Sequence, residues 1–147
     1  MASLSISSPI GNLVIDEDNG VIGAIRWADE KTGTGSPLLN EAARQLEAYF
    51  AGKLSDFDLP LRPAGSDFER SVWDQMQKIP YGETRSYGEL AGALGSAPRA
   101  VGGACGKNPI PIVIPCHRVL AKAGLGGYSG SGGLKTKQAL LTLEGAL

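Results

Sequence analysis

The sequence predicts an α/β protein of the α+β kind, in which a small sheet covered by one helix precedes a helical region. Three observations predict it: a hairpin signal near the N-terminus, one amphipathic helix after it, and repeated helix-start signals in the second half. The composition, 42% hydrophobic and 20% charged, is that of an ordinary globular chain. A proline-rich stretch at residues 60–65 predicts a boundary between residues 1–63 and 64–147.

The first domain begins with β structure over residues 3–28. Two apolar runs, Leu13–Ile15 and Val21–Ile25, flank a segment that ends in Asn19-Gly20, which is a strong hairpin turn signal. Ser36-Pro37 then looks like an N-cap followed by proline at the first helical position, and apolar residues recur at helical spacing up to Gly52. Nothing in this domain suggests chemistry.

The second domain opens with two capping boxes. Ser66 with Glu69 starts one helix, whose apolar face includes Phe68, and Ser86 with Glu89 starts a shorter one. After a tight turn, Pro98 begins a further helix that runs to about Cys105. Two short helices joined by a three-residue turn fit a helix-turn-helix, although any αα-hairpin in a core fits as well.

Two adjacent glycines favour the first of these interpretations. Gly102 and Gly103 each cost a helix interior roughly 1 kcal/mol relative to alanine. Residues that small are useful where a backbone must come close to DNA or to a neighbouring element.

The strongest chemical signal follows the apolar run Ile110–Ile114, which we expect to be a short buried strand or extended segment. At its end stand Cys116, the only histidine of the chain, His117, and Arg118. A thiol attacks as thiolate, so a catalytic cysteine needs a base or positive charge nearby. The alternative is an inert buried cysteine, which is common. The position of this one, where a buried run meets a glycine-rich loop, favours a nucleophile.

Residues 124–133 contain six glycines and are either a flexible linker or a wall that approaches a flat ligand closely. Tyr128 and Ser129 would be its contributing side chains. The last helix runs from Leu134 to about Gly145 and carries Glu144 near its end, where a lone glutamate is normally exposed.

Charge is unevenly distributed along the chain. Residues 1–63 carry nine acids and five bases, whereas residues 64–147 carry six acids and nine bases. Seven bases and one acid between residues 84 and 137 suit a polyanion, or are merely a solvated surface.

Two cysteines make no disulfide framework, and no apolar stretch reaches the roughly 20 residues of a membrane span. No secretory signal is evident. We therefore expect a cytoplasmic monomer that holds no metal and no cofactor.

Several motifs, in order, resemble those of the O6-alkylguanine-DNA alkyltransferases. Residues Ile114–Val119 resemble the active-site signature of this family. Further family motifs are resembled, in the right order, by Ser86–Ala91, Arg99–Ala104, Asn108–Ile110 and Gly127–Gly130. The similarity is strong from about Phe68 to Glu144. It implies a ribonuclease-H-like fold for residues 1–63, and a DNA-binding, alkyl-accepting domain with a helix-turn-helix for residues 64–147.

The resemblance also implies roles for individual residues. It gives catalytic roles to Cys116 as nucleophile, His117 as base, Glu144 as the orienting carboxylate, Tyr87 as proton donor and Asn108 as a brace. DNA-binding residues would be Ser86, Arg99, Ala100, Gly103 and Arg118, and the flipped base would meet Tyr87, Val119, Tyr128 and Ser129.

The implied activity is DNA repair by a single irreversible transfer. Double-stranded DNA carrying O6-alkylguanine, and O4-alkylthymine as well, would donate its alkyl group to Cys116. A non-catalytic binder of alkylated DNA is an alternative, against which Cys116 itself counts. A cysteine hydrolase would need an oxyanion hole, and a transcriptional regulator a sensing domain, and the sequence announces neither.

Overall fold

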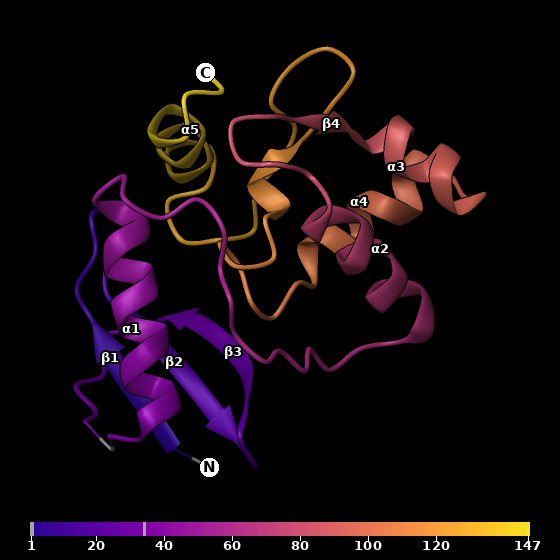
Figure 1. Ribbon diagram of the computed structural model, residues 1–147. Helices are drawn as coiled ribbons and strands as arrows, with labels where there is room; N and C mark the ends of the chain where they lie inside the picture. Colours follow the sequence, from indigo (N-terminus) through magenta and orange to yellow (C-terminus); the bar gives the residue numbers. More distant parts are fainter. Residues whose placement is uncertain (1, 34) are drawn as a thin grey trace. The chain divides into compact units, whose positions relative to one another are not determined.

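The computed structural model describes residues 2–33 and 35–147, which divide into two compact units, Met1–Pro63 and Ala64–Leu147 (Figure 1). Within the described residues, the first unit contains a three-stranded sheet and one helix, and the second contains four α-helices and a two-stranded sheet. The predicted α+β class is therefore confirmed. None of the described helices is long and apolar enough to cross a membrane.

The sheet of the N-terminal unit is a meander of β1 (Ala2–Ile6), β2 (Leu13–Asp18) and β3 (Val21–Trp27), all antiparallel. Asn19 and Gly20 both have positive φ, at 51° and 79°, as a two-residue hairpin turn of the favoured hand requires. The hairpin that the sequence predicted is confirmed.

Helix α1 (Pro37–Phe50) packs over β1 and β2 (Figure 1). The Ser36 side chain accepts a hydrogen bond from the Leu39 amide at 3.0 Å, so the predicted N-cap is confirmed. Leu46 and Tyr49 are among its fully buried residues. One polar side chain is buried with them, Gln45, whose amide group is hydrogen-bonded to the backbone of Asp58.

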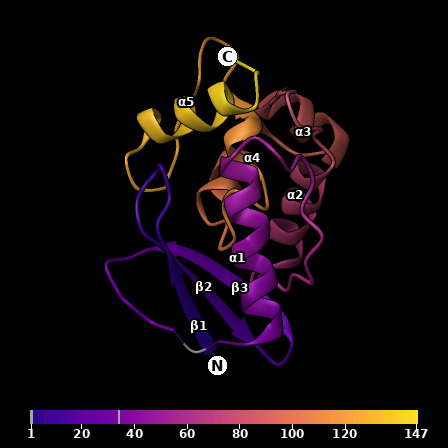
Figure 2. The same ribbon diagram turned by 60° about the vertical axis from the view of Figure 1, so that its left-hand side comes forward.

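The C-terminal unit begins with α2 (Asp67–Gln77), α3 (Tyr87–Leu94) and α4 (Pro98–Gly106), which pack on one another (Figure 2). Both predicted capping boxes are present. Phe68 is 37% exposed, so its predicted place on the buried face is wrong. It lies in the first turn of α2, and burial begins one turn later with Val72 and Trp73.

Two short strands connect this helix cluster to the cysteine segment. β4 (Arg85–Ser86) pairs in parallel with β5 (Val119–Leu120), directly after the 3-10 turn η1 (Cys116–Arg118). The last helix, α5 (Leu134–Leu143), packs against η1.

The run before Cys116 is buried as predicted, but it is a tight turn and no strand. The Ile114 amide donates to the Ile110 carbonyl at 2.9 Å, and Ile112 has a φ of 76°, rare for a β-branched residue. The Asn108 side chain braces this turn, because it donates to the Ile114 carbonyl at 2.8 Å and accepts from the Ile110 amide at 2.9 Å. Pro111 has no N–H to offer a neighbouring strand, which disfavours the extended alternative.

Candidate active site

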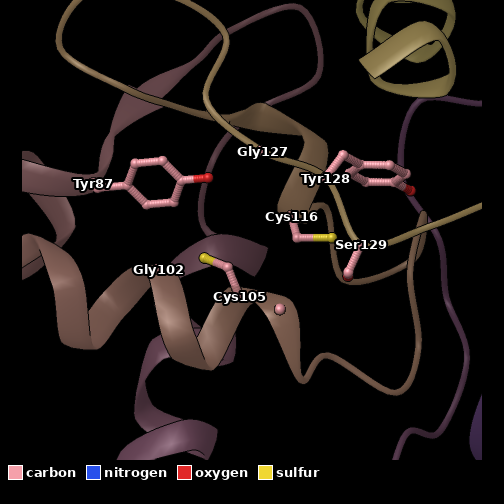
Figure 3. A pocket seen from close by; sticks show the side chains of 8 residues that line it. Tyr87, Gly102, Cys105, Cys116, Gly127, Tyr128 and Ser129 are labelled. Atoms are coloured by element: carbon pink, nitrogen blue, oxygen red, sulfur yellow. The ribbon is translucent and has the colours of Figure 1, made fainter. Parts of the chain in front are cut away.

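A cavity of about 490 Å³ lies between η1, α4, the start of α3 and the glycine-rich loop. Figure 3 shows Tyr87 on one side of it, Tyr128 and Ser129 on the other, and Cys116 between them. The remaining lining residues are small: Gly102, Cys105, Gly106 and Gly127. The cavity therefore offers aromatic and small-residue walls, as a flat apolar-faced ligand requires.

Cys116 is 7% exposed at the start of η1 and is a free thiol. Burial raises its pKa, while a hydrogen bond from Asn108 and the charge of Lys137 act in the opposite direction. The net direction is upward, so the thiol is protonated at neutral pH. A base must therefore remove its proton when it reacts.

His117 follows Cys116 in η1 and is the predicted base. Its Nε2 lies 2.7 Å from Oε2 of Glu144, and both side chains are fully buried. A carboxylate only accepts hydrogen bonds, so Nε2 carries the hydrogen and Nδ1 holds the free lone pair. Among the described residues Nδ1 has no hydrogen-bond partner. Burial lowers the pKa of His117 although Glu144 opposes this, so the imidazole is neutral and able to accept a proton.

The surroundings of Arg118 bear on its predicted DNA contact. It is buried, and all three guanidinium nitrogens are engaged inside the unit: Nε and Nη2 with Glu144 at 2.8 and 3.0 Å, and Nη1 with the Ile79 carbonyl at 2.7 Å. A side chain held in this way does not reach a DNA backbone. These internal hydrogen bonds count against the predicted DNA contact of Arg118, because they leave no guanidinium nitrogen unengaged.

Lys137 is a site residue that the sequence interpretation missed. Its ammonium group is buried and donates to the carbonyls of Val119 at 2.7 Å, Leu125 at 2.5 Å and Gly127 at 3.0 Å. It thereby ties the glycine-rich wall to β5. The predicted cluster of seven bases consequently loses two members, Arg118 and Lys137, to the interior.

Helical spacing could have revealed Lys137. It shares one face of α5 with Leu140, Leu141 and Glu144, which follow it at intervals of three, four and seven residues. All four are buried. A lysine on the same helix face as two leucines is expected to be buried with them. Counting Lys137 among the surface bases overlooked this spacing.

Tyr87 is the first residue of α3 and points its hydroxyl into the cavity (Figure 3). Burial raises its pKa to about 12, so it keeps its proton at neutral pH and is able to donate a hydrogen bond. Burial likewise raises the pKa of Tyr128. Ser129 lies at the exposed rim of the same cavity.

The other predicted contacts lie outside the cavity. Arg99, Ala100 and Gly103 are exposed on α4, and Ser86 is half-buried as the N-cap of α3. Val119 is buried, and its carbonyl already accepts from Lys137. A Cβ added to Gly102 or Gly103 would meet nothing within 4 Å among the described residues, so internal packing does not explain these two glycines.

The second cysteine also lines the cavity but has different neighbours. The Cys105 thiol lies 3.5 Å from the Met76 sulfur, and burial raises its pKa to about 12. In the described structure no hydrogen bond joins the Cys105 thiol to His117 or to the side-chain amide of Asn108. Of the two thiols, Cys116 has the groups that a nucleophile needs.

Two family models match the chain. The 6-O-methylguanine DNA methyltransferase DNA-binding domain matches residues 67–146, and the ribonuclease-like domain of the same proteins matches residues 3–63. Among curated relatives, a methylated-DNA–protein-cysteine methyltransferase of Mycolicibacterium paratuberculosis is 49% identical over 95% of this chain and 90% of its own length. One from Methanosarcina acetivorans is 45% identical over 95% of both chains.

Solved structures give the same result. The O6-methylguanine methyltransferase of Mycobacterium tuberculosis superimposes with a TM-score of 0.88 at 42% identity, covering 99% of this chain and 93% of that one. A structure of the Mycobacterium tuberculosis OGT in complex with DNA gives a TM-score of 0.89 at 44% identity, covering 99% and 94%.

Proposed function

The chain belongs to the 6-O-methylguanine DNA methyltransferase family, and we propose that it repairs DNA by moving an alkyl group from guanine O6 to its own Cys116. One observation carries the assignment to this residue. Cys116 lies in a cavity beside a histidine whose free nitrogen is buried and whose other nitrogen is fixed by a carboxylate. This is the arrangement of nucleophile, base and orienting group that activates a thiol.

The reaction is a displacement at the alkyl carbon. His117 Nδ1 accepts the Cys116 proton through a bridging water, because no direct hydrogen bond joins the two side chains in the described structure. The new bond forms between sulfur and carbon, and the bond between that carbon and O6 breaks. The guanine leaves with the electron pair and accepts a hydrogen bond or proton from the Tyr87 hydroxyl, which its raised pKa keeps protonated.

DNA is the partner of this reaction. The target atom lies inside the duplex, so the nucleotide must be flipped out to reach Cys116. Helix α4 serves both needs, since Arg99, Ala100 and Gly103 lie on its exposed side and Gly102 and Cys105 line the cavity. We assign Arg99 to the gap that the flipped base leaves, and the small residues to close approach of the backbone.

Each molecule reacts once. The product is a thioether, whose sulfur is a poor leaving group, and its alkyl carbon offers water no activated electrophile. A non-catalytic binder of alkylated DNA would have no use for a base beside the cysteine. We place the protein in the cytoplasm, where a free thiol stays reduced.

Mass spectrometry of the intact protein after incubation with O6-methylguanine duplex DNA tests the assignment. We expect a gain of one methyl group per molecule, mapped to the peptide that contains Cys116, and no further turnover. Cys116→Ala should take up no methyl group and still bind DNA, whereas Cys105→Ala should react like the original protein. Sustained turnover, or a methyl group on Cys105, would overturn the proposal.

A second variant tests the DNA part separately. Arg99→Ala should slow repair of duplex DNA more than transfer from the free base O6-benzylguanine, because only the duplex has a gap to fill. Lys107→Ala, an exposed cation near the end of the same helix, is the matched control for loss of charge alone. Equal losses on the duplex and the free base would remove Arg99 from this role.

A further inference from the structure

Arg118 holds the carboxylate that orients the base. Its Nε donates to Oε1 of Glu144 and its Nη2 to Oε2, so both carboxylate oxygens are fixed by one planar fork. The fork is itself anchored, because Nη1 donates to the Ile79 carbonyl and the guanidinium lies 5.8 Å from the centre of the Tyr81 ring. The Tyr81 hydroxyl in turn donates to the Leu143 carbonyl at 3.3 Å.

One carboxylate oxygen of Glu144 contacts both Arg118 and His117. Oε2 of Glu144 accepts from Arg118 Nη2 at 3.0 Å and from His117 Nε2 at 2.7 Å. The carboxylate therefore cannot rotate without losing contacts to one partner. Because Nε2 is fixed, the direction of the opposite nitrogen, Nδ1, is fixed as well.

Charge gives Arg118 a second effect. A buried carboxylate on its own would favour the imidazolium form of His117, and Nδ1 would then carry a proton and be unable to accept one. The charged or titratable groups around His117 are Glu144, Arg118, Lys137 and Cys116. The positive charge of Arg118 on the same carboxylate opposes imidazolium formation, and Lys137 acts in the same direction.

Resting on the proposed function, we propose that Arg118 is a positioning residue of the transfer reaction: it holds the Glu144 carboxylate against His117 and balances its charge. His117 thus remains a neutral, correctly aligned base. Lysine can replace only the charge of Arg118 and leucine neither charge nor hydrogen bonds, because neither presents a planar fork to two oxygens.

The only histidine of the chain makes this testable by NMR on the untagged protein. The ring signals of His117 should report its tautomer and its pKa without overlap. Arg118→Met, which keeps an unbranched apolar stem, should raise the pKa of His117 by about one unit or more, corresponding to a tenfold or larger change in the protonation equilibrium. The acid limb of the pH profile for transfer from free O6-benzylguanine should move upward by the same amount.

Two further variants keep the test decisive. Arg118→Met combined with Glu144→Gln removes both charges and should return the pKa of His117 below its ordinary value. Arg118→Lys keeps a charge without the fork, so it should move the acid limb in the same direction by less; it decides the test if Arg118→Met does not fold. Duplex binding should be unchanged in every folded variant.

The outcomes separate the two proposals. An unchanged pH profile and His117 pKa in folded Arg118→Met, or in Arg118→Lys if that variant must decide, would leave Arg118 with a merely structural role and overturn the inference. Weaker DNA binding with normal transfer from the free base would do the same. If the original protein transfers no alkyl group at all, the proposed function fails, while the NMR titration still reports whether Arg118 controls His117.

Discussion

The two units of this chain treat polar side chains in opposite ways. Among the described residues the N-terminal unit buries one polar side chain, the uncharged Gln45. Besides its two thiols, the C-terminal unit buries Thr136 and four charged or basic side chains: His117, Arg118, Lys137 and Glu144. Charged groups in the N-terminal unit, such as Arg26 with Asp16, form ion pairs that stay partly exposed.

This difference separates stability from chemistry. Taking a charge out of water costs several kcal/mol per ion, and an internal pair returns this only with good geometry and further hydrogen bonds. The C-terminal unit meets that cost around one cysteine, with a bidentate Arg118–Glu144 pair and three carbonyls on Lys137. Among its described residues the N-terminal unit buries no charged side chain.

The largest effect that sharpens this comparison is a cavity in the N-terminal core. Leu46→Ala removes a fully buried side chain of α1 and should lower the free energy of unfolding by about 2–5 kcal/mol. The transfer rate of the folded protein should not change, because nucleophile, base and cavity belong to the other unit. Urea denaturation and transfer from free O6-benzylguanine measure the two quantities. Glu47→Ala, exposed on the same helix, is the control, and a slower rate in folded Leu46→Ala would contradict the separation.

The next effect belongs to a buried charge. Lys137→Met keeps the aliphatic stem and removes the ammonium group that ties the cavity wall to β5 and whose charge lowers the pKa of Cys116. We expect transfer to slow at least tenfold, about 1.4 kcal/mol in the barrier, since the developing thiolate loses the stabilising effect of this positive charge. The free energy of unfolding should change less, because the variant loses three hydrogen bonds but no longer has to bury a charged group. Lys135→Met, exposed two positions earlier, should react normally; equal rates in the two variants would exclude this role.

Several features that depend on neighbouring residues in the sequence were predicted correctly. The hairpin at Asn19-Gly20 and the capping boxes at Ser66 and Ser86 were predicted correctly because each depends on residues within a few positions. Local chemistry of this kind needs no knowledge of the tertiary fold. Tyr87 and Asn108 lie in the ordered motifs and near Cys116, so both could be named in advance. Glu144, which contacts His117, was named from the family resemblance.

Helical spacing could have marked Lys137 as buried, but local pattern could not identify the partners of Lys137 or Arg118. The roles of Arg118 and Lys137 depend on partners 26 and 18 residues away, Glu144 and the Val119 carbonyl, and on which side of α5 faces inward. An arginine in a basic stretch is usually on the surface, so nothing in the local pattern opposed the DNA contact that the resemblance implied for Arg118. The turn at Ile112 was missed for the same reason, because its positive φ is held by burial and by Asn108.

A surface pair in the N-terminal unit should contribute much less than the buried groups. Asp16 accepts hydrogen bonds from Arg26 at 2.9 Å and Ser3 at 2.6 Å. Burial raises the pKa of Asp16, but these bonds outweigh it and the net direction is downward. Asp16→Asn should therefore lower the free energy of unfolding at pH 7 by less than about 1 kcal/mol.

The pH dependence of that effect has a definite sign. The ionised form of Asp16 is favoured in the folded state, so its contribution is complete above the unfolded pKa of about 3.9 and is lost as pH falls through the lowered folded value. Denaturation of the original protein and of Asp16→Asn at pH 7 and in acid should show the difference shrink. The exposed Asp29→Asn should show none, and a difference that grows in acid would reverse the assignment.

The smallest effect is expected for Cys105→Ala, which tests whether a buried thiol in the cavity wall is needed for transfer. Cys105 lines the same cavity as Cys116, yet its neighbour is the Met76 sulfur and burial raises its pKa to about 12. A thiol that stays protonated and lacks a base is a poor nucleophile, so Cys105→Ala should change the transfer rate by no more than about twofold. Peptide mapping of the alkylated protein should find Cys105 unmodified. A tenfold loss in folded Cys105→Ala would mean that the cavity needs both thiols, and that contact with the His117–Glu144 pair is not what distinguishes the reactive one.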